Sequence, residues 1–175
     1  RPLVPEDAKD RLARRQANAA VALLRLEHER KVWPMLRHRP DPRTRSYLIH
    51  RLRPLNADAI RILRQLDRPN EVSIQRALIH ALGDYQEARF PSDVRESWAS
   101  RLLELYASHP DPGVHSASAW TLRRWGRHED ILAVDMRFAT GRPEGDRRWY
   151  VNRRGQTFVV IPQPGEIVIG SPPYE

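Results

Sequence analysis

The 175-residue sequence contains no cysteine, which excludes disulfide bonds, thiolate metal sites and a cysteine nucleophile within these residues. No apolar run approaches the roughly 20 residues that a membrane-spanning helix requires, and no signal-peptide pattern opens the chain. The phosphate loop GxxxxGK(S/T), the dinucleotide-binding GxGxxG, HExxH, GxSxG and the calcium loop are all missing. The sequence therefore predicts no catalytic residue, no cofactor and no metal site, and it leaves the compartment open.

Lysine is also scarce, since Lys9 and Lys31 are the only two in the chain. Lys and Arg nevertheless total 30 against 22 Asp and Glu, so the net charge of +8 is carried almost entirely by arginine. The planar guanidinium suits phosphate and carboxylate recognition, whereas a solvated face and a genome rich in G and C explain the same composition without a partner. The candidate contacts for an anionic partner are the paired arginines Arg14, Arg15, Arg123, Arg124, Arg147, Arg148, Arg153 and Arg154.

The chain repeats itself. Three segments resemble one another: PDPRTRSYLIHRL at 40–52, NEVSIQRALIHAL at 70–82 and PDPGVHSASAWTLRRWG at 110–126. Aligned on Leu52, Leu82 and Leu122, they are separated by 82 − 52 = 30 and 122 − 82 = 40 residues. Spacings of this size are typical of repeat architectures, in which stacked units share a core that no unit can bury alone.

Each segment predicts a helix. The turns that open them are Asp41-Pro42, Asn70-Glu71 and Asp111-Pro112, where Asp or Asn can cap the first turn and proline gives up no needed N–H. Apolar stripes at helical spacing follow: Ile74, Ala77, Leu78, Ala81 and Leu82 in one copy, and Val114, Ala117, Thr121, Leu122 and Trp125 in another. A weaker copy at 13–26 places Ala17, Ala20, Val21 and Leu24 on one face. Further helices are expected around 29–37, 57–66 and 93–107, so the fold class is mainly α.

These residues resemble the HEAT-repeat family, whose second helix carries a β-branched residue followed by arginine near its start. The corresponding pairs are Thr44-Arg45, Ile74-Gln75 and Val114-His115, so only the first copy keeps the arginine. The resemblance covers about residues 5–140. It implies a HEAT-like α-solenoid of three to four helix pairs over residues 1–140, without a regular arginine ladder.

The pattern changes after residue 140. Gly141, Pro143 and Gly145 indicate a linker at 141–147, and the residues from 148 to 175 are expected to start a second domain. Trp149 to Val151 and Thr157 to Ile161 predict two strands of a hairpin around a turn at 152–155, and 166–170 is a third strand candidate.

The stretch TFVVIPQPGEIVIGSP at 157–172 is similar to the opening of the formylglycine-generating enzyme (sulfatase-modifying factor) family. The matching residues are Val159, Val160, Ile161, Pro162, Gly170, Ser171 and Pro172, whereas Pro164 and Ile169 depart from the family pattern. The resemblance implies that a C-terminal domain begins here and carries no catalytic residue of that family onto this chain. The order of segments also resembles bacterial multidomain proteins that include a serine/threonine kinase domain and helical repeats.

Single polar and aromatic residues have structural explanations. His50 and His80 recur at one repeat position, but neighbouring helices stand roughly 10 Å apart, too far to share one metal ion. Asp41 and Asp111 are expected to cap helices instead of acting as general bases. We expect Trp33, Trp98, Trp120 and Trp125 to pack in the helical core, and Trp149 to belong to the hairpin.

Two functional hypotheses follow. The first is a non-catalytic scaffold or interaction module in a larger multidomain protein, whose partners are neighbouring domains or another protein. Since the chain begins at Arg1 and not at Met, we expect it to be part of a longer polypeptide. The alternative is a basic, HEAT-like nucleic-acid-binding module similar to alkylpurine DNA glycosylases. The even spread of arginine along the helices argues against it, and no membrane partner is expected.

Overall fold

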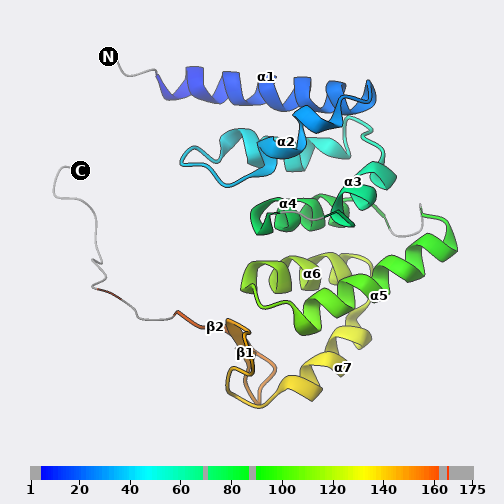
Figure 1. Cartoon of the computed structure of the whole chain (residues 1–175), viewed down its shortest axis with the longest axis vertical. Helices are drawn as coiled ribbons and strands as arrows, with labels where there is room; N and C mark the ends of the chain where they lie inside the picture. The colour runs from blue at the N-terminus through cyan, green and yellow to red at the C-terminus, as the bar shows by residue number, and fades with distance from the viewer. Residues whose placement is uncertain (1–4, 69–70, 87–89, 162–164, 166–175) are drawn as a thin grey trace.

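The computed structural model describes residues 5–68, 71–86, 90–161 and 165, and it is mainly helical with a short two-stranded antiparallel sheet (Figure 1). The helices are α1 (Glu6–Arg25), α2 (Arg43–Leu52), α3 (Ala59–Leu66), α4 (Val72–Gly83), α5 (Ser92–Ser108), α6 (Pro112–Arg124) and α7 (His128–Phe138). Two 3-10 segments, η1 (Glu29–Lys31) and η2 (Trp33–Leu36), lie between α1 and α2. The strands are β1 (Trp149–Val151) and β2 (Thr157–Val159).

The helices lie in two rows. In the first row α1 contacts α2, α2 contacts α4, and α4 contacts α6 (Figure 1). In the second row α3 packs on α4, α5 packs on α6, and α7 contacts both α5 and α6. The chain therefore passes through the second row after α2, α4 and α6, and these three helices run in the same direction.

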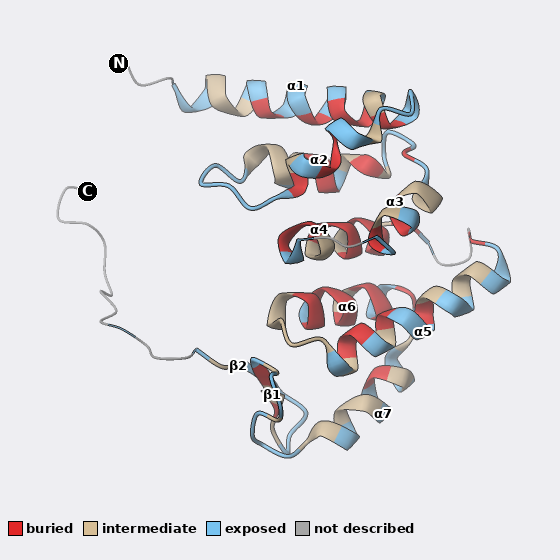
Figure 2. Ribbon diagram, viewed as in Figure 1, coloured by how far each residue is buried: buried red, intermediate tan, exposed pale blue. Residues whose placement is uncertain are grey.

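The buried residues follow the predicted stripes. Leu52, Leu82 and Leu122, on which the repeat was aligned, are all fully buried. Figure 2 shows buried residues concentrated where helices of the first row face one another, with exposed residues on the outer turns. The stripes predicted for α1, α4 and α6 are buried at every position. The predicted apolar stripes are therefore confirmed as core residues.

The predicted helix starts are confirmed in part. Asp111 is the N-cap of α6, and its carboxylate accepts a hydrogen bond from the Val114 amide. At α2 the N-cap is instead Pro42, and Asp41 lies one residue before it. The Asp41 carboxylate accepts a hydrogen bond from the Arg43 amide at 3.0 Å. Glu71 is the N-cap of α4, without a side-chain capping bond, and Asn70 lies outside the described residues.

Two predicted segments differ from the structure. The helix expected at 29–37 is replaced by η1 and η2, since Pro34 has no N–H to continue an α-helical ladder. The helix expected at 13–26 begins earlier, at Glu6, where acidic residues in the first turn complement the helix dipole. Helix α7 had no predicted counterpart because its apolar stripe is short, with Ile131 as its only buried residue.

The predicted hairpin is confirmed over 149–159. Trp149 pairs with Val159, Tyr150 with Phe158, and Val151 with Thr157 in an antiparallel register. Gly155 has a φ of 75°, the left-handed conformation that favours glycine in a tight turn. The third strand candidate at 166–170 lies outside the described residues.

The hairpin packs directly against the helices. Trp149 and Val151 are fully buried, the Arg148 amide donates to the Pro110 carbonyl, and β1 contacts α7. Residues 141–147 connect α7 to β1, and the Gly141 amide donates to the Val151 carbonyl at 3.0 Å. The assignment of these residues to a linker between two domains stays a prediction.

Within the part of the chain that is described, no helix combines the length and the apolar character needed to span a bilayer.

Candidate functional site

The candidate arginines begin with Arg14 and Arg15 on α1. Arg14 Nε lies 2.9 Å from Asp10 Oδ2, and its guanidinium carbon lies 5.1 Å from the centre of the Tyr47 ring. The guanidinium of Arg51 lies 5.6 Å from the same ring, so Tyr47 is approached by two cations. Arg15 is exposed and forms no ion pair with any residue that the structure describes. Of this pair, only Arg15 is free for an anionic partner.

The second pair lies in the last turn of α6. Arg124 Nε donates to the Gly83 carbonyl at 2.7 Å, and its guanidinium carbon lies 5.2 Å from the centre of the Trp120 ring. Arg123 is exposed and has no ion-pair partner among the described residues. Arg124 therefore links α6 to the end of α4, while Arg123 stays available to solvent.

The remaining candidates surround the hairpin. Arg147 is largely buried, with Nη2 2.8 Å from Glu144 Oε2 and its guanidinium carbon 4.4 Å from the Phe138 ring centre and 4.9 Å from that of Trp149. The other three arginines of this region, Arg148, Arg153 and Arg154, are exposed. The four pairs thus lie on α1, at the end of α6 and around the hairpin, and do not converge on one patch. Their role as contacts for an anionic partner stays a prediction.

Polar bonds join one copy of the repeat to the next along the starts of α2, α4 and α6. Arg45 donates through Nε to the Leu36 carbonyl at 2.9 Å and through Nη2 to the Ser73 carbonyl at 3.2 Å. Arg76 donates hydrogen bonds to both carboxylate oxygens of Asp111, with 2.7 Å between Nε and Oδ1. The repeat alignment found Gln75 where an arginine was expected and so missed Arg76, one residue further along.

A second set of bonds joins the later turns. The Thr121 hydroxyl donates to the Ile79 carbonyl at 2.8 Å, and the Trp125 indole donates to the Tyr85 carbonyl at 3.1 Å. The Tyr85 hydroxyl in turn donates to the Ala57 carbonyl at 2.8 Å. Each of these side chains is buried and satisfied by backbone of the preceding copy, so the stacking order is specified by polar contacts as well as by apolar area.

Asp111 both caps α6 and accepts hydrogen bonds from Arg76 of α4, so these contacts should be sensitive to acid. Burial raises the pKa of Asp111, but Arg76 and the amides of Val114 and Gly113 outweigh burial and hold that pKa below 3.8. Because the folded pKa is lowered, the stabilisation is present above pH 3.8 and is lost as the pH falls toward the folded pKa. Asp111→Ala should lower the free energy of unfolding by about 1–2 kcal/mol at neutral pH, since both the cap and the Arg76 pair are lost.

Urea denaturation of the wild type, Asp111→Ala and Asp111→Asn checks this prediction. Asp111→Asn keeps an acceptor for the Val114 amide and should therefore recover part of the loss. The free energy of unfolding of Asp111→Asn should also decrease less than that of the wild type when the pH is lowered. Equal stability of all three proteins would mean that neither contact contributes.

The hairpin is held by a stack of rings. His115 of α6 lies between Tyr106, at a centroid distance of 4.3 Å, and Trp149, at 3.7 Å, with both pairs nearly parallel. His115 Nδ1 lies 2.7 Å from the Tyr106 carbonyl, and Nε2 lies 3.4 Å from Thr157 Oγ1. The Trp149 indole donates to the His109 carbonyl at 2.8 Å. The arrangement resembles a packed structural contact, because it leaves neither ring nitrogen of His115 open to solvent.

Burial lowers the pKa of His115 to about 4, so the neutral ring is the folded form. In the unfolded chain this ring takes up a proton near its ordinary value of 6.5. The contribution of His115 to the free energy of unfolding is therefore fully present above pH 6.5. It should fall by about 1.4 kcal/mol per pH unit as the pH is lowered from about 6.5 to 4. His115→Phe keeps a stacking ring without a titrating group, and it should flatten the dependence measured by urea midpoints across this range.

Two further histidines share the direction of this shift. Burial lowers the pKa values of His80 and His109, and both remain in the wild type and in the variant, so the difference between the two proteins isolates His115. His128→Gln, on the exposed start of α7, should keep the wild-type dependence. An unchanged slope in His115→Phe would contradict the assignment.

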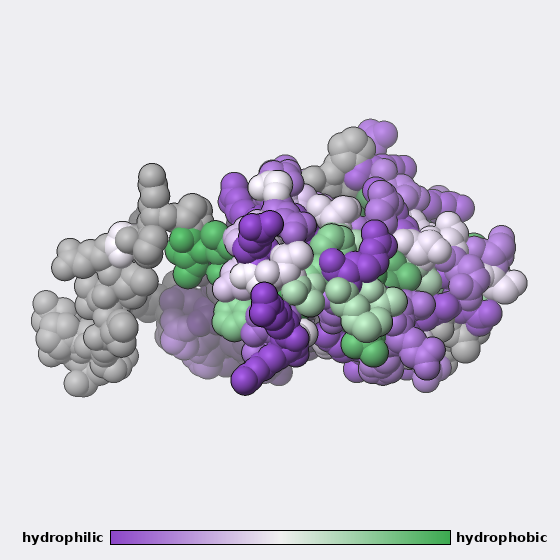
Figure 3. Space-filling model, turned by 90° about the horizontal axis from the view of Figure 1, so that it is seen from below, coloured by the Kyte–Doolittle hydropathy of each residue, from purple (hydrophilic) through white to green (hydrophobic). Residues whose placement is uncertain are grey.

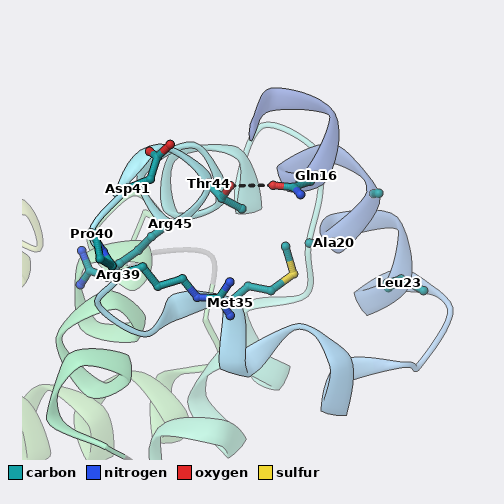
Figure 4. A pocket seen from close by; sticks show the side chains of 10 residues that line it. Gln16, Ala20, Leu23, Met35, Arg39, Pro40, Asp41, Thr44 and Arg45 are labelled. Carbon is teal, nitrogen blue, oxygen red and sulfur yellow. Dashed lines mark hydrogen bonds between the residues drawn. The ribbon is translucent and has the colours of Figure 1, made fainter. Parts of the chain in front are cut away.

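A hollow with a volume of about 540 Å³ lies between α1, η2 and the start of α2 (Figure 4). Ala20 and Leu23 of α1 form one wall, and the Met35 side chain points toward Ala20 from the opposite side. The Thr44 hydroxyl donates to Gln16 Oε1 at 2.8 Å across the upper edge. Arg39, Pro40, Asp41 and Arg45 complete the lining. No pattern in the sequence predicted this pocket, because its residues come from three separate segments.

The described residues contain no group of three histidine, aspartate or glutamate side chains that could hold a metal ion. His50 Nδ1 lies 3.9 Å from Asp84 Oδ2, and the His80 ring packs against Trp120 at a centroid distance of 5.3 Å. The two histidines therefore have different partners. Trp33 and Trp125 are buried as expected, whereas Trp98 and Trp120 are half-buried.

No protein-family model matches the sequence, and neither a curated protein nor a solved structure matches it. The class of protein is therefore defined by the fold alone, as a mainly helical chain with two rows of helices and a docked hairpin.

Proposed function

We propose that the chain is a non-catalytic, HEAT-like α-solenoid module of three to four helix pairs, acting as a scaffold within a larger multidomain protein. The observation that carries this proposal is the repeated set of bonds between copies. Arg45 reaches from α2 to α4, Arg76 reaches from α4 to the cap of α6, and Thr121 returns from α6 to α4. Such nearest-neighbour contacts are typical of repeat proteins, whose function is to present an extended surface.

The exposed apolar residues support a neighbouring domain at one end of the stack. Five of the nine large hydrophobic residues that are exposed in the described chain lie on α7 or in the hairpin region: Leu132, Met136, Phe158, Val159 and Ile161. Figure 3 looks onto this end and shows green surface patches among hydrophilic residues. Exposed apolar residues that gather at one end of a molecule are a candidate interaction site. We therefore place the next domain against α7 and the hairpin.

The proposed neighbour is a formylglycine-generating-enzyme-like domain that begins within residues 148–175. The support is the resemblance at 157–172. Of its matching residues, Val159 ends β2, and Val160 and Ile161 directly follow that strand. The segment itself is proposed to have no enzymatic activity. Its partners are neighbouring domains of the same polypeptide or a second protein, and it uses no cofactor.

The size of the native polypeptide tests this proposal. An antibody raised against residues 6–138 should detect, in the source cells, a band far above the 20.4 kDa of this chain. A band at 20.4 kDa would remove the multidomain proposal.

The alternative function, binding to nucleic acid, is motivated by the net charge of +8. Contacts with phosphates release counterions, so such binding must be strong at about 50 mM salt and must fall steeply as salt is added. Many arginines are already paired within the protein, among them Arg61 with Glu27 and Glu29, and Arg127 with Glu96. We therefore expect no salt-dependent binding to a labelled DNA duplex or to single-stranded RNA. Tight binding at low salt would favour the alternative.

A further inference from the structure

From the pocket of Figure 4, we infer that the chain binds an acidic peptide segment that inserts an apolar side chain between α1 and η2 and pairs a neighbouring carboxylate with Arg39. This inference rests on the proposed function as an interaction module, and it names the chemistry of one partner. Three properties of the pocket support it: an apolar interior, an unpaired positive charge and walls that are fixed in position.

The interior of the pocket accepts an aliphatic side chain. Ala20 is buried in the wall that α1 forms, and Leu23 and Met35 are half-buried beside it. Met35 is unbranched and flexible, so it can adjust to side chains of different shape. A volume of about 540 Å³ lies within the range in which proteins bind small ligands, and it leaves room for one aliphatic side chain. Burial of an aliphatic side chain, such as that of leucine, methionine or isoleucine, in this interior therefore favours binding.

The charge at the edge of the pocket is positive. Arg39 is exposed and has no carboxylate partner among the described residues. Asp41, the one carboxylate that lines the pocket, is already held by Arg43, whose Nη1 lies 2.9 Å from Asp41 Oδ2. Arg45, which also lines the pocket, donates only to backbone carbonyls. A carboxylate on the ligand therefore finds a free guanidinium and no competing acid.

The partially buried charge of Arg45 adds to this field. Burial, with a smaller contribution from Arg76, lowers the pKa of Arg45, because its charge is not balanced by a nearby carboxylate. A charge removed from water is costly unless it is paired. An anionic ligand in the adjacent pocket relieves part of this cost, so it is favoured over a neutral ligand of the same shape.

The lining distinguishes a peptide from a nucleic acid. None of the pocket residues is aromatic, so the pocket offers no ring on which a base could stack. A phosphate site typically combines several free guanidinium or amide donors, whereas Arg39 is the only free cation among these described residues. One apolar recess beside one free arginine fits a hydrophobic residue next to aspartate or glutamate.

The walls are held in place before any ligand arrives. Gln16 and Thr44 join α1 to α2, and Arg45 fixes the end of η2 through the Leu36 carbonyl. The Tyr47 hydroxyl donates to Asp10, a second bond that joins α2 to α1. A preformed pocket avoids much of the entropy cost of binding. We therefore expect affinity from short linear peptides and not only from a folded partner.

Selection of a random peptide library on the purified chain tests the inference. The enriched peptides should share an aliphatic residue within two positions of aspartate or glutamate. One such peptide, synthesised with a fluorescent label, should bind in a polarisation assay. Arg39→Ala should weaken this binding about tenfold, the effect of losing one charge-assisted hydrogen bond. Arg39→Glu should weaken it further and should prefer the same peptide with lysine in place of its acidic residue.

Ala19→Trp tests whether the peptide enters the pocket. Ala19 is exposed on α1 and lines the pocket, so an indole there blocks the recess without entering the core. Ala22→Trp is the matched control, because Ala22 is exposed on the same helix and lines a different hollow. Ala19→Trp should abolish binding and Ala22→Trp should preserve it, with circular dichroism showing equal helix content in both.

Three results would overturn the inference: no enriched motif, enrichment of basic peptides, or binding that Ala19→Trp leaves intact. These results are distinguishable from failure of the proposed function. A native species of 20.4 kDa would remove the multidomain proposal and leave peptide binding unchanged. A large native species without peptide binding would keep the scaffold and remove the pocket.

Discussion

Trp149→Ala should lower the free energy of unfolding by about 3–5 kcal/mol, the range for deleting a fully buried tryptophan. The Trp149 side chain has no exposed surface, stacks on His115 at 3.7 Å and donates to the His109 carbonyl. The guanidinium of Arg147 lies 4.9 Å from its ring centre. Deletion of the indole therefore removes packing, a hydrogen bond and a cation–π contact together. Urea denaturation at neutral pH measures the loss.

The variant should also separate docking of the hairpin from folding of the helices. If Trp149 is the main anchor of the hairpin, limited proteolysis should cut near residues 141–147 faster in the variant, while helix content stays close to that of the wild type. Tyr150→Ala is the matched control on the same strand, since Tyr150 is half-buried and, among the rings that the structure describes, stacks only on Phe158 at 5.4 Å. It should cost about 1 kcal/mol, as expected for one aromatic pair. Equal losses for the two variants would contradict the anchoring role.

Leu82→Ala should lower the free energy of unfolding by about 2–5 kcal/mol, since a fully buried leucine is replaced by a cavity. Leu82 is the repeat-register leucine of α4, and α4 contacts α2, α3 and α6. The cavity therefore opens in the middle of the stack, where the copies share their core. Chemical denaturation followed by both circular dichroism and tryptophan fluorescence measures the change.

The two probes should report coincident transitions in the wild type and in Leu82→Ala, because the copies bury one continuous core. Leu132→Ala is the control, as Leu132 is 58% exposed on α7, and it should change stability by less than about 0.5 kcal/mol. Separate transitions in Leu82→Ala, with one half of the stack unfolding first, would show that the copies are weakly coupled. A loss under about 1 kcal/mol would contradict the burial argument.

The sequence predicted helices and the hairpin correctly where apolar periodicity and the capping or turn residues indicated the same element. The stripe that begins at Ile74 and the cap at Asp111 each predicted a helix that the structure contains. The hairpin was predicted because Gly155 ends a polar turn between two β-prone runs. Prediction was poorer where the local signal was weak, as in α7, whose exposed Leu132 and Met136 blur the pattern.

The candidate site was predicted less well. Adjacent arginines were identified as a group, yet neighbours such as Arg123 and Arg124 have different environments, one in solvent and one bonded to Gly83. Arg76 was missed because its function depends on reaching Asp111, 35 residues away. Sequence spacing cannot reveal which charge is already paired.

The sequence by itself determined where the helices and the hairpin form, because capping residues, proline and apolar periodicity act over a few neighbouring residues. The tertiary structure decided which of these features meet. It placed His115 between Tyr106 and Trp149, and it formed the pocket from parts of α1, η2 and the start of α2. Burial and charge pairing arise only when distant segments pack, so the pocket and the free charge of Arg39 were visible only in the folded chain.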